Sequence, residues 1–402
     1  MRRLIFSHGL LELYALALAV VQLPGGVRTD EAKYLLSIPY PHPPLLRTLF
    51  ASLSWMPYQE LFWRFVIASA VVQAVWLLWD LGYVFPRPKR LALASSWLFS
   101  AAVVLQAGTV MMAPLTALFG LVCVWLVLRP HPIAKTSAPL IGLFWFLGLF
   151  SIYQTVLYLP LLLGVFRKAH LRARDFCLFL GMPLLLLVLY TVAHPLLLAS
   201  IVHVGSQDAA LPISLRLWKI LWILLVSGSG MLTVVGIAGI LVSGRKELLV
   251  TLMALVSYIA LTSQEYYAIL LTPLLASGVF LLLCKRRLSS TCYLPPHVLM
   301  SVLFVFTLFP SAHPSSARET MHFLRTHGVT SMQEFLLMDG PFGHEWQYES
   351  SAPIGRFTQQ VSSSIEDRAQ AIVCTKKTCE EDVNTEMWKR LDGAPVEVWI
   401  RR

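Results

Sequence analysis

Two adjacent carboxylates, Asp30 and Glu31, follow the first long apolar run of the chain, and Lys33 stands close behind them. Carboxylates beside an apolar segment are costly to keep away from water, so in membrane proteins they often mark a functional site. In a partly desolvated cleft, a carboxylate can take a proton from a hydroxyl or amine nucleophile. A structural interpretation is also open, because Thr29 and Asp30 are good helix N-caps for the segment that follows.

Further polar residues stand at the ends of apolar segments that we expect to share one side of a membrane. Basic residues there can hold a phosphate group, or they can extend their charges to the lipid headgroups without a specific ligand. With Lys33, the candidates for binding a substrate or lipid phosphate are His42, Arg47, Arg64, Tyr153, Arg216, Lys219, Glu265, Tyr266 and Tyr267. Glu12 and Asp80 lie inside apolar runs and are expected to form hydrogen bonds between helices.

The elements that must position these residues are hydrophobic helices. The chain is 56% hydrophobic and only 13% charged, which is too apolar for a soluble domain and predicts an all-α polytopic membrane protein. We expect about eleven transmembrane helices, since a helix of roughly 20 apolar residues crosses a bilayer. The apolar segments cover residues 8–26, 60–84, 91–107, 110–128, 138–150, 152–166, 176–197, 217–243, 248–263, 266–283 and 294–310.

The positions of the basic residues predict the orientation. The net charge of +10 does not indicate nucleic-acid binding, because the cations are scattered over loop ends rather than gathered on one face. Sixteen of the 32 Lys and Arg stand at the N-terminus or in short connectors near residues 87–90, 129–135, 167–174, 245–246 and 285–287. The positive-inside rule then places the N-terminus in the cytoplasm, and the first loop (28–59) and the residues after 311 outside. We expect the first apolar run to be retained as a helix rather than cleaved as a signal peptide.

Three smaller elements are expected. Residues 138–166 are short for two full crossings, so we predict two short helices that turn near 151–154 beside a polar cavity. Residues 45–58 are typical of an amphipathic helix at the outer interface, although a simple loop is the alternative. Residues 312–402 are more polar, with predicted strands at 334–338 and 396–400 and a helix at 378–391.

We therefore divide the chain into a transmembrane domain (1–311) and a small extracytoplasmic α/β domain (312–402). In that outer domain, Cys374 and Cys379 are candidates for a disulfide, because they lie close together in a compartment that permits one. Four further cysteines lie in or beside apolar runs and are expected to act as small apolar side chains.

The stretch Asp30-Glu31-Ala32-x-Tyr34, followed by Tyr40-x-His42-Pro43-Pro44-Leu45, resembles the first outer loop of polytopic glycosyltransferases with the GT-C fold. The similarity is greatest to the superfamily of dolichyl-phosphate-mannose protein mannosyltransferases and aminoarabinose transferases. Weaker echoes are Ala113-Pro114-Leu115, Gly148 to Tyr153, and Tyr266 to Pro273.

The resemblance implies an inverting transfer of a sugar from a polyprenyl-phosphate carrier to a glycan, lipid or protein acceptor on the outer side of the membrane. It implies Asp30 as the base, with Glu31 supporting it or helping to bind a divalent cation. His42 would shape the cleft, and the basic residues would neutralise the departing phosphate. By analogy the membrane is a bacterial inner membrane.

The sequence departs from the family pattern where acids or a lysine are usual, at Pro41, Leu115 and Ile152. These departures favour the alternative of a non-catalytic relative that binds a lipid carrier or scaffolds an envelope complex. A transporter is a third hypothesis. It predicts functional polar residues in both halves of the membrane, whereas this sequence concentrates them on one expected side.

Overall fold

A computed structural model describes residues 2–38, 44–131, 133–195, 212–227, 230–262, 264–308, 315–329, 335–338, 344–350, 371–374 and 385–402. The described chain is mostly helical and ends in a small sheet. Its residues group into two compact units. The first unit comprises Met1–Val20, Pro39–Leu49 and Leu61–Phe309, and the second comprises Val21–Ile38, Phe50–Glu60 and Pro310–Arg402. Thus the segment that carries Asp30 and Glu31 groups with the C-terminal residues.

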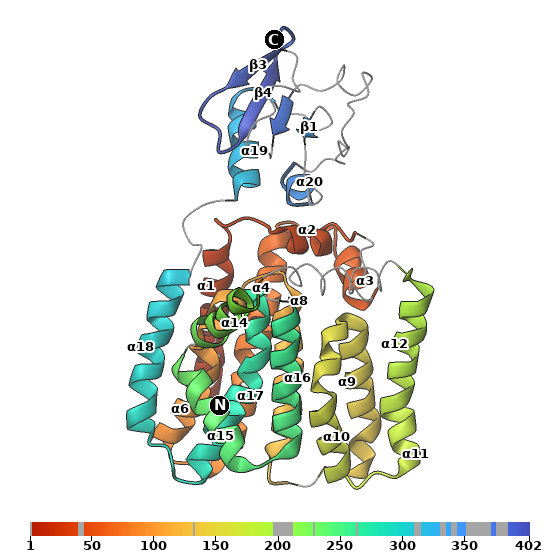
Figure 1. Cartoon of the computed structure of the whole chain (residues 1–402), viewed down its shortest axis with the longest axis vertical. Helices are drawn as coiled ribbons and strands as arrows, with labels where there is room; N and C mark the ends of the chain where they lie inside the picture. The colour runs from red at the N-terminus through yellow and green to blue at the C-terminus, as the bar shows by residue number, and fades with distance from the viewer. Residues whose placement is uncertain are drawn as a thin grey trace. The chain divides into compact units, whose positions relative to one another are not determined.

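The first unit is built from helices, many of which run alongside one another (Figure 1). The boundaries between the two units fall within three of its helices, α1, α3 and α4. The elements are α1 (Arg2–Gln22), α3 (Pro44–Ser52), α4 (Gln59–Gln73), α5 (Val75–Leu81), α6 (Arg87–Leu98), α7 (Ala101–Gln106), α8 (Met112–Leu128), α9 (Ala138–Ser151), α10 (Leu159–Lys168), α11 (Ala173–Phe176), α12 (Met182–Ala193), α14 (Ile213–Trp222), α15 (Met231–Ser243), α16 (Lys246–Thr262), α17 (Thr272–Cys284) and α18 (Ser290–Leu308). Short 3₁₀ and π segments join or extend them: η1 (Gly82–Val84), η2 (Lys135–Ser137), η3 (Tyr153–Tyr158), η4 (Cys177–Gly181), η6 (Ile223–Ser227) and η7 (Glu265–Leu271).

Three helices of the described chain are long and apolar enough to cross a membrane: Gln59–Val84, Ala173–Ala193 and Tyr266–Cys284. Shorter apolar helices include Met112–Leu128, Ala138–Ser151 and Met231–Ser243. On the helix Ala173–Ala193, apolar side chains such as Val188 and Val192 are exposed, as expected of a face that meets lipid rather than water. The class of largely helical membrane protein is therefore supported, while the eleven crossings stay a prediction.

Glycines bring α15 and α17 of the first unit into close backbone contact. A Cβ atom added to Gly278 would lie 1.9 Å from the Gly236 carbonyl oxygen, and one added to Gly239 would lie 2.0 Å from that of Gly278. Here the two backbones touch, because glycine alone has no side chain to keep them apart. Small residues are the usual means by which helices associate in lipid, where there is little hydrophobic force between them.

Polar residues inside the apolar runs join helices to one another. Glu12 of α1 accepts hydrogen bonds from Ser69 and Gln73 of α4, both at 2.8 Å. Asp80 of α5 accepts one from Trp125 Nε1 of α8, also at 2.8 Å. The predicted role of Glu12 and Asp80 as hydrogen-bond partners between helices is confirmed.

Some expected boundaries differ in the structure. The predicted span 217–243 is divided into α14 with η6 and, after Gly230, α15; Gly230 has a φ of +39°, which ends a regular helix. The interfacial helix expected over 45–58 is α3 and ends at Ser52. The two short helices expected over 138–166 are present as α9 and α10, with η3 as the turn between them.

The second unit contains the helices α2 (Thr29–Leu35), α19 (Ser316–Thr326) and α20 (His344–Ser350) and a four-stranded sheet. The strands β1 (Phe335–Met338), β2 (Ala371–Cys374), β3 (Trp388–Leu391) and β4 (Glu397–Arg401) lie in the order β1-β2-β4-β3. β1 pairs parallel with β2, and the other pairs are antiparallel. The strands predicted near 334–338 and 396–400 are thus present. The helix predicted over 378–391 is wrong at Trp388–Leu391, because pairing with β4 overrides the local helical preference; residues 378–384 lie outside the described part.

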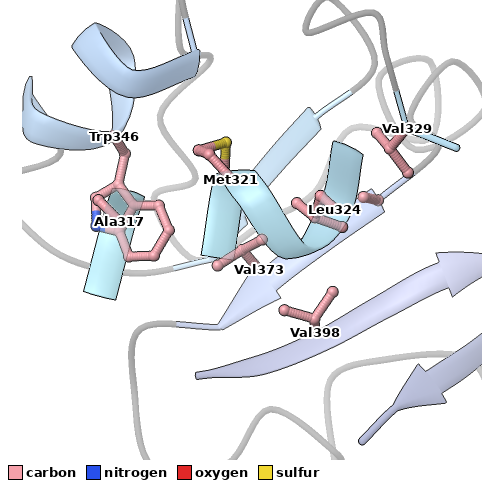
Figure 2. Close-up of a cluster of buried hydrophobic side chains, with 8 residues drawn as sticks. Ala317, Met321, Leu324, Val329, Trp346, Val373 and Val398 are labelled. Carbon is pink, nitrogen blue, oxygen red and sulfur yellow. The ribbon is translucent and has the colours of Figure 1, made fainter. Parts of the chain in front are cut away.

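One hydrophobic cluster holds this unit together (Figure 2). α19 turns Ala317, Met321 and Leu324 toward the sheet, where Val373 of β2 and Val398 of β4 are paired in register. Trp346 brings α20 into the same cluster. Because α20 is fixed by this tryptophan, its neighbour Glu345 has a defined position.

Candidate functional site

The predicted acidic pair begins the short helix α2. Arg28 is the N-cap residue, in extended conformation, and its backbone N–H donates to Glu31 Oε2 at 2.8 Å. An acid at this third helical position satisfies a free backbone donor and interacts favourably with the helix dipole. Glu31 is buried, with 1% of its surface exposed. The N-cap expected at Thr29 or Asp30 is therefore Arg28 instead, and Glu31 makes the capping contact.

Asp30 and Lys33 form an ion pair one turn apart on α2. Lys33 Nζ donates to Asp30 Oδ1 at 2.8 Å, and the side chains are 6% and 38% exposed, respectively. A buried ammonium group needs such a partner, since burial without one is costly. The pairing leaves the Asp30 carboxylate partly exposed at the surface of the unit.

The C-terminal segment adds a third carboxylate to α2. Helix α20 packs against α2, and Thr29 Oγ1 donates to Glu345 Oε2 at 2.6 Å. Burial raises the pKa of the Glu345 carboxyl above its usual value. The hydrogen bond from Thr29 and the charge of Lys33 lower this pKa, while the charge of Asp30 raises it further. Sequence reasoning missed Glu345, because nothing in the local sequence around it indicates contact with a loop more than 300 residues earlier.

Arg318 of α19 fixes the same segments together. Its Nη2 donates to Glu60 Oε2 at 2.5 Å and to Glu349 Oε1 at 2.7 Å, and its Nη1 donates to the carbonyl oxygen of Leu23. Burial acts to lower the pKa of Arg318, but its bonds and charge interactions with Glu349 and Glu60 raise it overall. The guanidinium therefore stays charged and connects three parts of the chain that are distant in sequence.

A glycine permits the chain to approach α19 closely beside this network. Gly26 has a φ of +67°, and a Cβ atom there would lie 2.4 Å from Ser315 Oγ. Ser315 is the N-cap of α19, and its Oγ accepts from the Arg318 backbone N–H at 3.1 Å. Both the backbone conformation and the space at Gly26 therefore exclude a larger residue.

In the first unit, predicted site residues meet in a cluster of tyrosines around Gln154. Gln154 Nε2 donates to the hydroxyls of Tyr258 at 3.1 Å and Tyr267 at 3.2 Å. The rings of Tyr266 and Tyr267 lie 4.4 Å apart between centroids, and Tyr153 forms a hydrogen bond with Tyr258. Gln154 is 4% exposed, and its Oε1 has no hydrogen-bond partner among the described residues. The structure thus brings Tyr153, Tyr266 and Tyr267 together, as a polar cluster at the ends of apolar helices.

The remaining predicted residues are spread over other elements. Arg64 of α4 is buried, and its Nη1 donates to the Gly108 carbonyl oxygen at 2.9 Å, a structural contact. Arg47 on α3 is half-buried. Arg216 and Lys219 are half-buried on α14, which carries exposed apolar residues such as Trp218 and runs across the direction of its neighbours (Figure 1).

Three further predictions fall partly or wholly outside the described residues. His42 lies outside them. Glu265 begins η7, but its side chain is outside the described part. Cys374 at the end of β2 is disulfide-bonded, and its predicted partner Cys379 lies outside the described residues; Cys123, Cys177, Cys284 and Cys292 are free.

The acidic pair is poorly suited to a divalent cation. Asp30 already binds an ammonium group, and Glu31 already accepts a backbone N–H, so neither carboxylate presents a full set of free oxygens. Across the described part of the chain, no group of three or more His, Cys, Asp or Glu side chains could hold a metal ion.

The fold and these contacts define a largely helical membrane protein in which a short polar helix packs with a small C-terminal α/β segment. Neither the known protein families nor curated protein sequences gave a match to this chain.

Proposed function

We propose that the protein is an inverting glycosyltransferase that moves a sugar from a polyprenyl-phosphate carrier to an acceptor at the outer side of a membrane. The observation that carries the proposal is the cluster on α2, where a carboxylate and a buried ammonium group lie 2.8 Å apart within a chain of apolar helices. A reaction of this kind requires a proton acceptor for the nucleophile and a polar, cationic environment for a phosphate leaving group.

In this proposal the acceptor hydroxyl or amine attacks the anomeric carbon from the face opposite the phosphate. The bond from that carbon to the phosphate oxygen breaks, and its electron pair leaves with the polyprenyl phosphate. A carboxylate beside α2 takes the proton of the nucleophile, and Asp30 is the candidate from the sequence. Because the bilayer already confines the donor, alignment of the two reactants can supply much of the rate, up to about 7–11 kcal/mol.

The proposal includes the finer topology expected from the sequence. About eleven crossings place the N-terminus in the cytoplasm, and they place α2 and residues 312–402 outside. The membrane is then a bacterial inner membrane, and the partners are the lipid carrier and a glycan, lipid or protein acceptor. The tyrosine cluster around Gln154 offers hydroxyl and amide groups of the kind that bind sugars.

The test is sugar transfer by the purified full chain in proteoliposomes supplied with polyprenyl-phosphate sugars. If Asp30 is the base, Asp30→Ala is expected to reduce transfer by about 100-fold or more, as loss of an acid–base group does. The matched control is Asp392→Ala, which removes the same group from a side chain that is 93% exposed. Full activity of Asp30→Ala would overturn the role of Asp30, and absence of transfer by the wild type from every such donor would overturn the function.

A second candidate is a non-catalytic protein that binds the lipid carrier. The favouring observation is that Asp30 and Glu31 both have structural partners, the first in an ion pair and the second in a helix cap. Binding of the lipid carrier to the protein in proteoliposomes, with no turnover of any sugar donor, would favour this candidate over the first.

A further inference from the structure

The two carboxylates of α2 and that of Glu345 on α20 differ in the partners that their oxygens bind. Glu31 accepts the backbone N–H of its own N-cap, and Asp30 is paired with the ammonium group of Lys33. Each acid of α2 therefore already has one carboxylate oxygen occupied by a donor from α2 or its N-cap.

Glu345 has a different environment. Its Oε2 accepts a hydrogen bond from the neutral Thr29 hydroxyl at 2.6 Å, and its side chain is half-buried on α20. Partial burial and the negative charge of Asp30 both disfavour the ionised form of Glu345. A general base works best when its proton affinity is matched to the working pH, which burial achieves for carboxylates.

We propose, on the basis of the proposed function, that Glu345 is the residue that takes the proton from the acceptor, and that Thr29 positions its carboxylate through their hydrogen bond. As the nucleophile's lone pair forms the bond to the anomeric carbon, its O–H or N–H bond breaks and the proton passes to a Glu345 carboxylate oxygen. The electron pair of the broken carbon–oxygen bond leaves on the carrier phosphate, so one proton is transferred and no oxidant or reductant is needed. The catalytic base is thus supplied by the C-terminal segment rather than by the first loop.

Several charged groups surround α20. Asp30 and Lys33 of α2 act on Glu345 itself, whereas Arg318 and Arg325 of α19 contact Glu349 one turn further along. The acid side of a pH–rate profile is therefore expected to depend on Glu345 and its two neighbours on α2. Transfer should rise as the pH increases through the pKa of Glu345, because the base must be deprotonated, and that pKa is above its usual value.

The experiment measures sugar transfer against pH for the full chain in proteoliposomes with polyprenyl-phosphate sugars. Glu345→Gln keeps the shape of the side chain and is expected to reduce transfer about 100-fold or more and to abolish the acid limb. The matched control, Glu319→Gln, removes an exposed carboxylate of α19 and is expected to leave both unchanged. Glu345→Asp is expected to restore part of the rate.

Thr29→Val provides a test that keeps the carboxylate. The hydrogen bond from Thr29 lowers the pKa of Glu345, so its removal should move the acid limb to higher pH. If Glu345→Gln keeps the wild-type rate and an intact acid limb of the pH–rate profile, Glu345 is not the base, although the proposed function stands. The same conclusion follows if Thr29→Val leaves the acid limb at its wild-type pH. A wild type that transfers no sugar overturns the function, and the assignment with it.

Discussion

Replacement of Arg318 by methionine tests whether the contacts of this half-buried cation hold the second unit together. The arginine is 28% exposed and pairs with Glu60 and Glu349, whose side chains are each 11% exposed. Methionine has a similar length but no charge, so Arg318→Met leaves two nearly buried carboxylates and the Leu23 carbonyl oxygen without this donor. The expected result is opening of the contact between α19, α20 and the segment before α2.

The size of the effect follows from the burial of the partners. Removal of one member of a buried ion pair costs about 3–5 kcal/mol, because the partner is left as an uncompensated charge. Partial exposure of Arg318 lets water reach the carboxylates, so we expect a loss of about 2–4 kcal/mol. At 1.4 kcal/mol per factor of ten, the open population should rise between about 30-fold and several hundred-fold.

The assay is limited proteolysis of the full chain in lipid nanodiscs, with cleavage within residues 315–402 followed by mass spectrometry. The cleavage rate tracks the open population when reclosing is fast. Arg325→Met is the control, because Arg325 is exposed and donates to the Glu349 backbone carbonyl oxygen at 3.0 Å. It should change the rate less than about five-fold. If Arg318→Met is cleaved at the same rate as the wild type, or at the same rate as Arg325→Met, the Arg318 contacts do not hold the second unit together.

Two further substitutions test the packing of each unit. Gly278→Ala should prevent normal folding, since its Cβ would lie 1.9 Å from the Gly236 carbonyl oxygen. The control Gly9→Ala, whose Cβ would have nothing within 4 Å, should keep the wild-type size-exclusion profile in detergent. A normal profile for Gly278→Ala would show that α15 and α17 are not packed this closely. Leu324→Ala should cost about 2–5 kcal/mol by opening a cavity in the fully buried cluster beneath α19. His322→Ala, on an exposed position of the same helix, should cost little in the same proteolysis assay, and equal effects would contradict the core assignment.

Several features of the protein could be predicted from the sequence because they depend on local composition and spacing. Apolar runs of helical length predict membrane helices, and the alternating stretch 396–400 predicts the strand β4. The polar residues Glu12 and Asp80 could be predicted to form hydrogen bonds between helices, since lipid provides no other partner. The dense polar stretch around Asp30 likewise indicates from the sequence alone that α2 has a functional or structural role.

Other features were decided by tertiary structure alone. The local sequence does not show that Asp30 forms an ion pair with Lys33 or that Glu31 caps its own helix. It also does not show that Glu345 of α20 accepts a hydrogen bond from Thr29 of α2. The strand at Trp388–Leu391 was likewise missed, because its pairing with β4 outweighs local preference. Asp30 and Glu345 are more than 300 residues apart, and the pKa of Glu345 depends on burial and neighbouring charge, which exist only once the chain has folded. The sequence therefore determined which residue types are available for proton transfer, and the folded contacts decided which carboxylate we assign to it.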